Sequence, residues 1–216
     1  GVVETFSDLT ALKHLEEEVQ QARILGALGE MAATVAHEIR NPLGGIGGYA
    51  GLLARDLDQE DPRRKLVNKI IQGVSSLNKI VSNLLFYTRK TQLRLVPVEL
   101  KNFFSDILDY VEIECQKDDK QIVLVKDFPE DELVAEIDPE RFQQIVLNLM
   151  FNAVQAIKED GTIGLSMVAN AKHILVHIRD SGIGISSENM KQIFNPFFTT
   201  KEQGTGLGLA IVKKIV

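Results

Sequence analysis

Residues 144–157 read QIVLNLMFNAVQAI, an apolar stretch with helical spacing that carries two asparagines, Asn148 and Asn152. The asparagines are four residues apart, so they share one face of the predicted helix. An amide inside an apolar helix is unfavourable unless a partner satisfies it. One interpretation is that both amides bond to local backbone. The other is that their carbonyl oxygens face Mg²⁺ and phosphate groups, because Mg²⁺ prefers oxygen ligands.

Short strands and longer helices alternate around this stretch. The strands are predicted at residues 121–127, 133–137, 162–168 and 173–180, and the helices at residues 101–117 and 139–160. Strands interleaved with helices indicate a separate α+β domain. We place it at residues 93–216, after a linker at about residues 90–96.

A carboxylate and two glycines follow the last predicted strand. Asp180 is at the strand end, and Gly182 and Gly184 come directly after it. Glycines permit a ligand to approach the backbone closely, and Asp180 could accept a hydrogen bond from the exocyclic amine of adenine. Taken alone, the motif is better explained as an ordinary turn at the end of a strand.

A second glycine motif opens a helix near the end of the chain. Its residues are Gly204, Thr205, Gly206, Leu207 and Gly208. Glycines at a helix start let backbone N–H groups and the helix dipole hold phosphate. No strand directly precedes the motif, which argues against a Rossmann loop, and no GK[ST] follows it, which excludes a Walker A loop.

The segment FNPFFTTK, residues 194–201, separates the two glycine motifs. Its phenylalanines, beginning with Phe194, are predicted to anchor a mobile lid. Lys201 or the threonines, including Thr200, would then reach phosphate. The alternative is a hydrophobic turn packed on the domain core.

The first part of the chain has a different pattern. Helical spacing runs from Leu12 to about Leu57, the segment DQEDP at 58–62 predicts a turn, and a second helix runs to about Arg89. Apolar residues of the second helix recur in steps of four and three, which is typical of a coiled-coil seam. Two such helices form a hairpin with little core of its own, so a homodimeric four-helix bundle is expected.

His37 lies in this first helix, within the sequence HEIRNPL at 37–43. A helical wheel puts it opposite an apolar stripe that includes Val35, Ile39 and Ile46, so His37 is predicted to point outward. Glu38 could orient the imidazole or accept its proton, which would let a ring nitrogen attack phosphorus. Asn41, one turn on, could position a water. The zincin motif HExxH would need a second histidine at position 41, so Asn41 argues against a zinc site here.

Composition narrows the function classes. The net charge of −6 argues against nucleic acid or an anionic membrane as a partner. One cysteine cannot form an internal disulfide, which fits a cytoplasmic location. No apolar run reaches the length of a membrane span and no leader precedes the chain, so we expect no membrane contact by this fragment.

The order of these motifs resembles that of the sensor histidine kinases. HEIRNPL resembles their phospho-acceptor H-box, and the downstream motifs resemble their N, G1, F and G2 boxes. The resemblance covers nearly the whole chain and looks closest to the nitrogen-regulation branch. It implies a multidomain protein, in which a helical hairpin precedes an α/β-sandwich ATP-binding domain of the Bergerat (GHKL) type. Gyrase, Hsp90 and MutL share this domain type.

The resemblance also implies roles for the residues. His37 would receive a phosphoryl group from MgATP, Glu38 would assist as base, and Asn41 would serve a reverse phosphatase reaction. Asn152 would coordinate Mg²⁺ with Asn148 beside it. The residues implied to surround the nucleotide are Asp180, Gly182, Gly184, Phe194, Thr200, Lys201, Gly204, Thr205, Gly206, Leu207 and Gly208. The implied partners are a second copy of the chain and the receiver domain of a response regulator.

Two departures from the family pattern stand out. Many members carry a basic residue three places after the metal-binding asparagine, but here it is Gln155, so Lys201 is a candidate replacement. The sequence stops at Val216, inside a helix, so the ATP-binding domain is expected to be C-terminally incomplete.

At the other end, residues 1–24 are expected to form a signal helix that follows the tail of a PAS-like sensor domain, and residues 25–92 the dimerisation and phosphotransfer hairpin. Two alternatives to a kinase remain open on the sequence. One is a protein that acts chiefly as a response-regulator phosphatase through Asn41. The other is a non-catalytic, ATP-binding dimeric scaffold.

Overall fold

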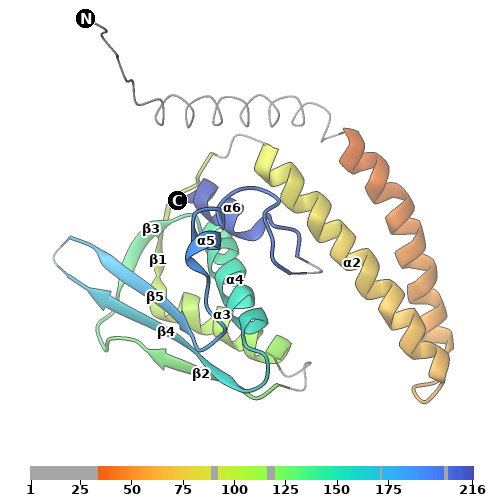
Figure 1. Cartoon of the computed structure of the whole chain (residues 1–216), viewed down its shortest axis with the longest axis horizontal. Coiled ribbons are helices and arrows are strands. Elements are labelled where there is room, and N and C mark those ends of the chain that lie inside the picture. The colour runs from red at the N-terminus through yellow and green to blue at the C-terminus, as the bar shows by residue number, and fades with distance from the viewer. Residues whose placement is uncertain (1–33, 89–91, 116–119, 171, 202–203) are drawn as a thin grey trace, which may run out of the picture. The chain divides into compact units, whose positions relative to one another are not determined.

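The computed structural model describes residues 34–88, 92–115, 120–170, 172–201 and 204–216 (Figure 1). The chain divides into two compact units, residues 1–90 and 91–216, close to the predicted linker. The predicted signal helix and PAS-like tail at residues 1–24 lie outside the described residues. No helix in the described part of the chain has the length and apolarity that a membrane crossing requires.

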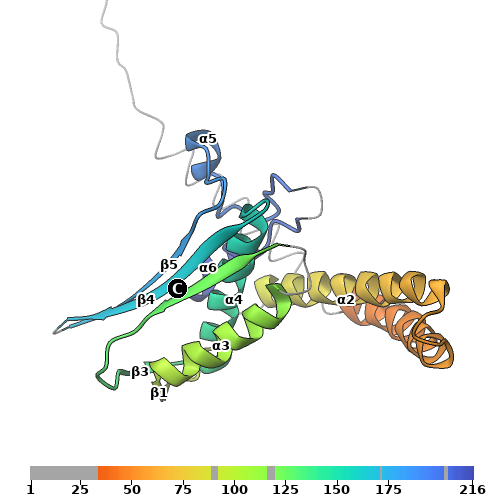
Figure 2. The same ribbon diagram turned by 90° about the horizontal axis from the view of Figure 1, so that it is seen from below.

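The first unit is an antiparallel helical hairpin (Figures 1 and 2). Its first helix is described over residues 34–56 and runs unbroken through Pro42. Its second helix is α2 (Pro62–Thr88). Near the open end, Arg40 Nη2 donates to Ser82 Oγ at 3.0 Å. Nearer the turn, a Cβ on Gly47 would lie 3.2 Å from Val74 Cγ1. These contacts fix the register of the two helices.

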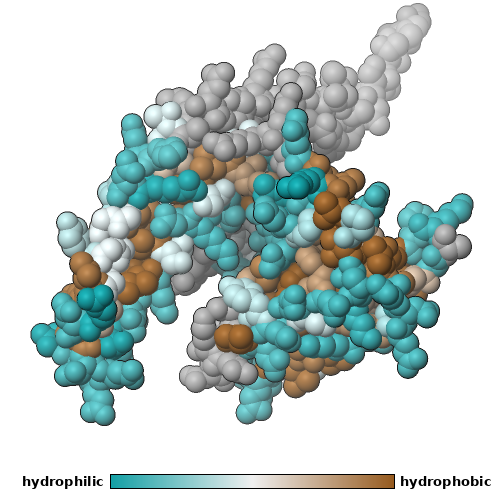
Figure 3. Space-filling view, turned by 180° about the vertical axis from the view of Figure 1, so that it is seen from behind, coloured by the Kyte–Doolittle hydropathy of each residue, from teal (hydrophilic) through white to brown (hydrophobic). Residues whose placement is uncertain are grey.

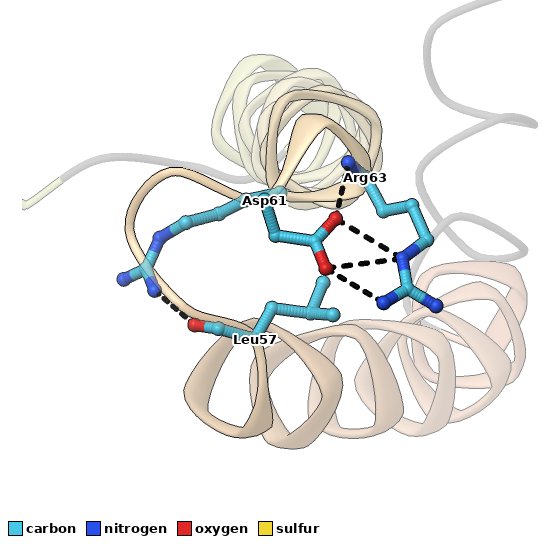
Figure 4. Close-up of polar contacts among 4 residues, drawn as sticks. Leu57, Asp61 and Arg63 are labelled. Atoms are coloured by element: carbon cyan, nitrogen blue, oxygen red, sulfur yellow. Dashed lines mark hydrogen bonds and ion pairs between the residues drawn. The ribbon is translucent and has the colours of Figure 1, made fainter.

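The turn of the hairpin is closed by hydrogen bonds around Asp61 (Figure 4). The carboxylate accepts from the backbone N–H of Arg63 at 2.8 Å and from Arg63 Nη2 at 2.6 Å. Arg64 Nη1 donates to the carbonyl of Leu57 at 2.6 Å, which ties α2 to the end of the first helix. These bonds from Arg63 lower the pKa of Asp61 to about 2. Asp61 therefore caps α2, and Pro62 fits the first helical position, where no N–H is needed.

The seam inside the hairpin is built mainly from small residues of the first helix. Its buried positions are Ala36, Leu43 and Ala50 on the first helix and Val67, Val81 and Leu85 on α2. The predicted apolar stripe lies one position away from this seam. Val35, Ile39 and Ile46 remain 40–49% exposed in the single chain. Alanines permit a close approach of the two helices, and the longer side chains are left on the surface, where Figure 3 shows apolar patches in brown.

The second unit contains two small sheets. β1 (Val96–Glu99) pairs antiparallel with β3 (Val134–Ile137). The other sheet has the order β2-β4-β5, formed by β2 (Ile122–Asp127), β4 (Gly161–Ala169) and β5 (Ile174–Asp180). β2 runs parallel to β4, and β5 runs antiparallel to it. The three-stranded sheet is therefore mixed, as in an α/β sandwich.

Two helices, α3 (Leu100–Cys115) and α4 (Pro139–Ala156), cover one face of this sheet (Figure 2). Alternate residues of β4, Ile163 and Leu165, point toward the helices and are almost fully buried. They pack with Phe104 and Leu108 of α3 and with Met150 of α4 in one continuous core. This two-layer arrangement confirms the predicted α/β sandwich.

The predicted elements agree closely with the observed ones, with three differences. Each predicted strand lies within one residue of its observed bounds. α4 ends at Ala156 and not at Asp160, because Ile157 adopts an extended conformation. β1 and the short helix α5 (Ser187–Met190) were not predicted, since Pro97 inside β1 argues against a strand and α5 is too short to show a helical period.

Candidate functional site

His37 is an exposed residue of the first helix. Glu38 and Asn41, one and four positions further on, are exposed as well. Arg40, by contrast, is half-buried and hydrogen-bonded to Ser82 of α2, so the side of the first helix that carries Arg40 is held against α2. The imidazole of His37 is therefore open to an incoming group, with a carboxylate next to it in sequence and an amide one turn away.

In the second unit, α4 places Asn148 and Asn152 next to the start of α6 (Gly208–Ile215). A Cβ on Gly208 would lie 3.6 Å from Asn148 Oδ1 and 4.0 Å from Asn152 Nδ2. Asn148 Nδ2 is buried and has no hydrogen-bond partner within the described ranges. A buried donor without a partner is unfavourable, so it marks a place where a polar ligand fits.

Lys201 contacts the same stretch of α4. Its Nζ donates to Asn152 Oδ1 at 3.1 Å and to Gln155 Oε1 at 2.6 Å. Burial of this side chain lowers the pKa of Lys201. In the sequence, Gln155 stands out only as the loss of a basic residue. The structure makes it a partner of Lys201, which brings a positive charge to the place where that basic residue would stand.

Asp180 ends β5 and begins a tight turn against the C-terminal end of α4. Its Oδ1 accepts from the N–H of Gly182 at 2.8 Å, and the N–H of Ile183 donates to the carbonyl of Ala156 at 3.1 Å. A Cβ on Gly182 would lie 2.6 Å from Ala156 Cβ and 2.7 Å from Asp180 Oδ1, so no side chain fits there. Gly184 has a φ of 71°, a conformation that favours glycine. Asp180 itself remains exposed and open to a ligand.

The segment 194–201 is held to the second glycine motif through Phe197. Phe197 has a φ of 66°, which is rare for a bulky residue, and its N–H donates to the carbonyl of Gly206 at 3.0 Å. Gly206 also has a φ of 66°, and a Cβ there would overlap the backbone of Phe197. Phe194 and Phe197 are exposed, so these two rings do not pack in the domain core, which was the alternative to a lid.

The remaining residues of this region serve its local structure. Leu207 is buried under α6 and packs in the core. Thr205 Oγ1 accepts from the N–H of Leu207 at 3.4 Å. Thr200 is exposed. A Cβ on Gly204 would meet Thr199 Oγ1, so a larger residue there would require the Thr199 side chain to move.

The structure thus gathers two groups of predicted site residues along the C-terminal half of α4. Asn148, Asn152, Lys201 and Gly208 form one group through the contacts above, and Asp180 with Gly182 forms the other around Ala156. An amide oxygen, an amide donor without a partner among the described residues, a helix N-terminus and a closely fitted glycine, Gly182, suit a nucleotide with its metal ion.

The comparisons with known families divide the chain in the same way. Residues 27–93 match the His Kinase A (phospho-acceptor) domain. Residues 137–216 match the histidine kinase-, DNA gyrase B- and HSP90-like ATPase family.

Similar individual proteins share this combination. Sensor histidine kinase ZraS of Escherichia coli (strain K12) is 37% identical over 202 residues, which are 94% of this chain and 43% of that protein. Histidine kinase ThkA, solved in complex with the response regulator protein TrrA, is 33% identical with a TM-score of 0.62. That match covers 98% of this chain and 61% of the solved one. Full-length ShkA, solved in complex with AMPPNP, has a TM-score of 0.69 at 27% identity, and the match covers 87% of this chain and 40% of ShkA. The chain spans less than half the length of the curated relatives it matches.

Proposed function

Because this chain belongs to the sensor histidine kinases, we propose that it transfers the γ-phosphoryl group of ATP to His37 and then to an aspartate of a response regulator. The observation that carries the proposal is the group formed by Asn148, Asn152, Lys201 and Gly208 beside the start of α6. It offers a phosphate and metal site in the same chain as an exposed histidine.

The nucleotide would be held by residues of the second unit. The Asn152 carbonyl oxygen would hold Mg²⁺, which offsets the negative charge of the phosphates. Asn148 Nδ2, which has no partner within the described ranges, would donate to a phosphate oxygen, and the N–H groups that open α6 would do the same. The exposed carboxylate of Asp180 would accept from the adenine amine, and Gly182 would let the base approach the turn.

The chemistry at His37 is nucleophilic substitution at phosphorus. A ring nitrogen of His37 forms a bond to the γ-phosphorus, and the bond from that phosphorus to the bridging oxygen of ADP breaks. Glu38 holds the imidazole in the required orientation and takes up its proton. Catalysis then rests mainly on positioning and on charge stabilisation, as in other phosphoryl transfers.

The proposal includes two protein partners. A second copy of the chain would cover the exposed apolar stripe of the hairpin, to form a four-helix bundle. A receiver domain would take the phosphoryl group from His37, which is supported by the ThkA structure, solved with the response regulator TrrA. Because ATP is the donor, we assign this part of the chain to the cytoplasm. Asn41, exposed one turn from His37, supports a reverse phosphatase reaction as a second activity.

Mass spectrometry at alkaline pH tests the assignment of the acceptor. The chain is incubated with MgATP, digested, and the modified peptides are sequenced. We expect one phosphoryl group on the imidazole of His37, and none in the Asn152→Ala variant. Phosphate on serine, threonine or another histidine would contradict the proposal.

A further inference from the structure

The ammonium of Lys201 is bound by two neutral amide oxygens. Asn152 Oδ1 lies 3.1 Å from Nζ and Gln155 Oε1 lies 2.6 Å from it. Asn152 and Gln155 are three residues apart on α4, so both side chains leave the same face of the helix. Among the residues that the structure describes, no carboxylate pairs with this ammonium. A small cation site made of amide oxygens is therefore occupied by a side chain of the protein itself.

We infer that the Lys201 ammonium and Mg²⁺ compete for one oxygen atom, Oδ1 of Asn152, an inference that rests on the proposed function. A magnesium ion bound to this oxygen would lie about 2 Å from it. The ammonium on the same oxygen would then be only a few ångströms from the metal, where two positive charges repel strongly in a partly buried site. The two cations therefore exclude each other, and Lys201 must leave Asn152 before the metal binds there.

Gln155 sets the strength of this competition. Its oxygen makes the shorter of the two bonds to Nζ and holds the ammonium within reach of Asn152. The backbone of Lys201 is fixed independently, since its N–H donates to Thr199 Oγ1 at 3.1 Å and its carbonyl accepts from the N–H of Gly204 at 3.1 Å. The side chain can therefore move away from Asn152 while the loop keeps its place. Removing either Gln155 or Lys201 should free Asn152 for the metal.

Calorimetric titration of the chain with ADP, once in excess Mg²⁺ and once in EDTA, tests the inference. ADP is the probe because it lacks the γ-phosphate that Lys201 could contact. In Gln155→Leu, we expect ADP affinity to be unchanged in EDTA, and in Lys201→Met we expect the ratio of the affinity in Mg²⁺ to that in EDTA to rise. In Mg²⁺, ADP binding to Gln155→Leu should be tighter by about threefold to tenfold, the scale of one ordinary hydrogen bond. Gln143→Leu, an exposed glutamine of the same helix, and Lys191→Met, an exposed lysine of the same unit, are the matched controls and should match the unmodified chain in both conditions.

Each other outcome has a distinct meaning. An unchanged ratio of the two affinities in both variants would overturn the competition. Binding of ADP by Lys201→Met that was weaker by the same factor in both conditions would also overturn it, because Lys201 would then be a plain phosphate contact. If the unmodified chain bound ADP in neither condition, the proposed function itself would fail. Because Gln155 is exposed, Gln155→Leu keeps the test valid even if Lys201→Met fails to fold.

Discussion

Single residues decide the shape of the region around the end of α4. Gly182 is enclosed by Ala156 and by the carboxylate of Asp180, so even a methyl group would overlap its neighbours. Asn148, on the same helix, differs: its amide nitrogen is buried and has no hydrogen-bond partner in the described part of the chain. A side chain therefore does not fit at position 182, whereas the Asn148 amide lacks a partner that a polar ligand could supply.

Gly182→Ala should destabilise the second unit and disturb the turn that carries Asp180. Because the added methyl group meets backbone as well as side-chain atoms, we expect a loss of about 1–3 kcal/mol in the free energy of unfolding, together with weaker ATP binding. Urea denaturation and calorimetry measure the two effects. Gly164→Ala, where a Cβ would lie 4.0 Å from the nearest atom, is the control and should cause neither. Equal stability of both variants would contradict the tight packing at Gly182.

Asn148→Leu should separate stability from binding. The leucine removes a buried amide donor that lacks a partner, so the free energy of unfolding should rise by up to about 1–3 kcal/mol. ATP binding should weaken at the same time, because the proposed phosphate contact is lost. Denaturation curves and calorimetric titration of the same sample test both statements, with Gln143→Leu of α4 as the control. A variant that is less stable and binds ATP normally would show that Asn148 serves only packing.

At the scale of one element, α4 is held at both ends by side chains that lie outside it. Asp138 caps its N-terminus: one carboxylate oxygen accepts from the N–H of Arg141 at 3.1 Å and the other from the N–H of Arg94 at 2.9 Å. Lys120 Nζ donates to the carbonyl of Ile157 at 2.7 Å, just after the last turn. Because α4 carries the asparagines, these anchors hold the binding residues in place.

The cap at Asp138 gives the stability of the second unit a defined pH dependence. The backbone N–H groups of Arg94 and Arg141 lower the pKa of Asp138. A lowered pKa means that the stabilisation is complete above the unfolded value, about 3.9, and is lost as the pH falls through the folded value. Asp138→Asn keeps one acceptor and does not titrate. It should be less stable than the unmodified chain at pH 7 by about 1 kcal/mol, because one of the bonds from Arg94 and Arg141 is lost, and the difference should shrink below about pH 4.

Denaturation curves of both proteins between pH 7 and pH 3 measure this difference. A gap in stability that stayed constant over that range would contradict the role of the ionised carboxylate.

At the scale of the whole molecule, the two units differ in how completely they bury their apolar residues. The second unit encloses a continuous core between its helices and its sheet. The hairpin has only a narrow seam and leaves Val35, Ile39 and Ile46 largely exposed. An exposed stripe of this kind indicates a surface that another protein covers, which is why the proposal includes a second copy of the chain.

Ile46→Glu should therefore convert a dimer into monomers. The glutamate would be buried without a partner in the bundle, so we expect the dissociation constant to rise by at least about tenfold. Sedimentation equilibrium over a range of concentrations measures it. Arg55→Glu changes a residue on the opposite side of the same helix and should leave the dimer intact. A monomeric unmodified chain would contradict the four-helix bundle.

How far the sequence predicted these features depended on periodicity. The long helices and the strands of six or more residues were predicted closely, because their apolar residues repeat often enough to define a face. The residues of the glycine motifs were predicted as a set, since their order along the chain matched a known pattern. The bond between Lys201 and Gln155 could not be predicted, because it joins a loop to a helix 46 positions apart in sequence. The position of the hairpin seam was missed by one residue, since alanine is only weakly apolar and carried little weight in the pattern.

The most direct test of the central claim is transfer of radiolabel from γ-labelled MgATP to the purified chain, compared with His37→Gln and Asn152→Ala. The account predicts a label on the unmodified chain that acid removes and alkali does not, and no label on either variant. Asn41→Ala, which changes a neighbouring polar residue on the same helix, should still become labelled. A label of unchanged intensity on His37→Gln, or one that survives acid, would contradict the claim that His37 is the phosphoryl acceptor.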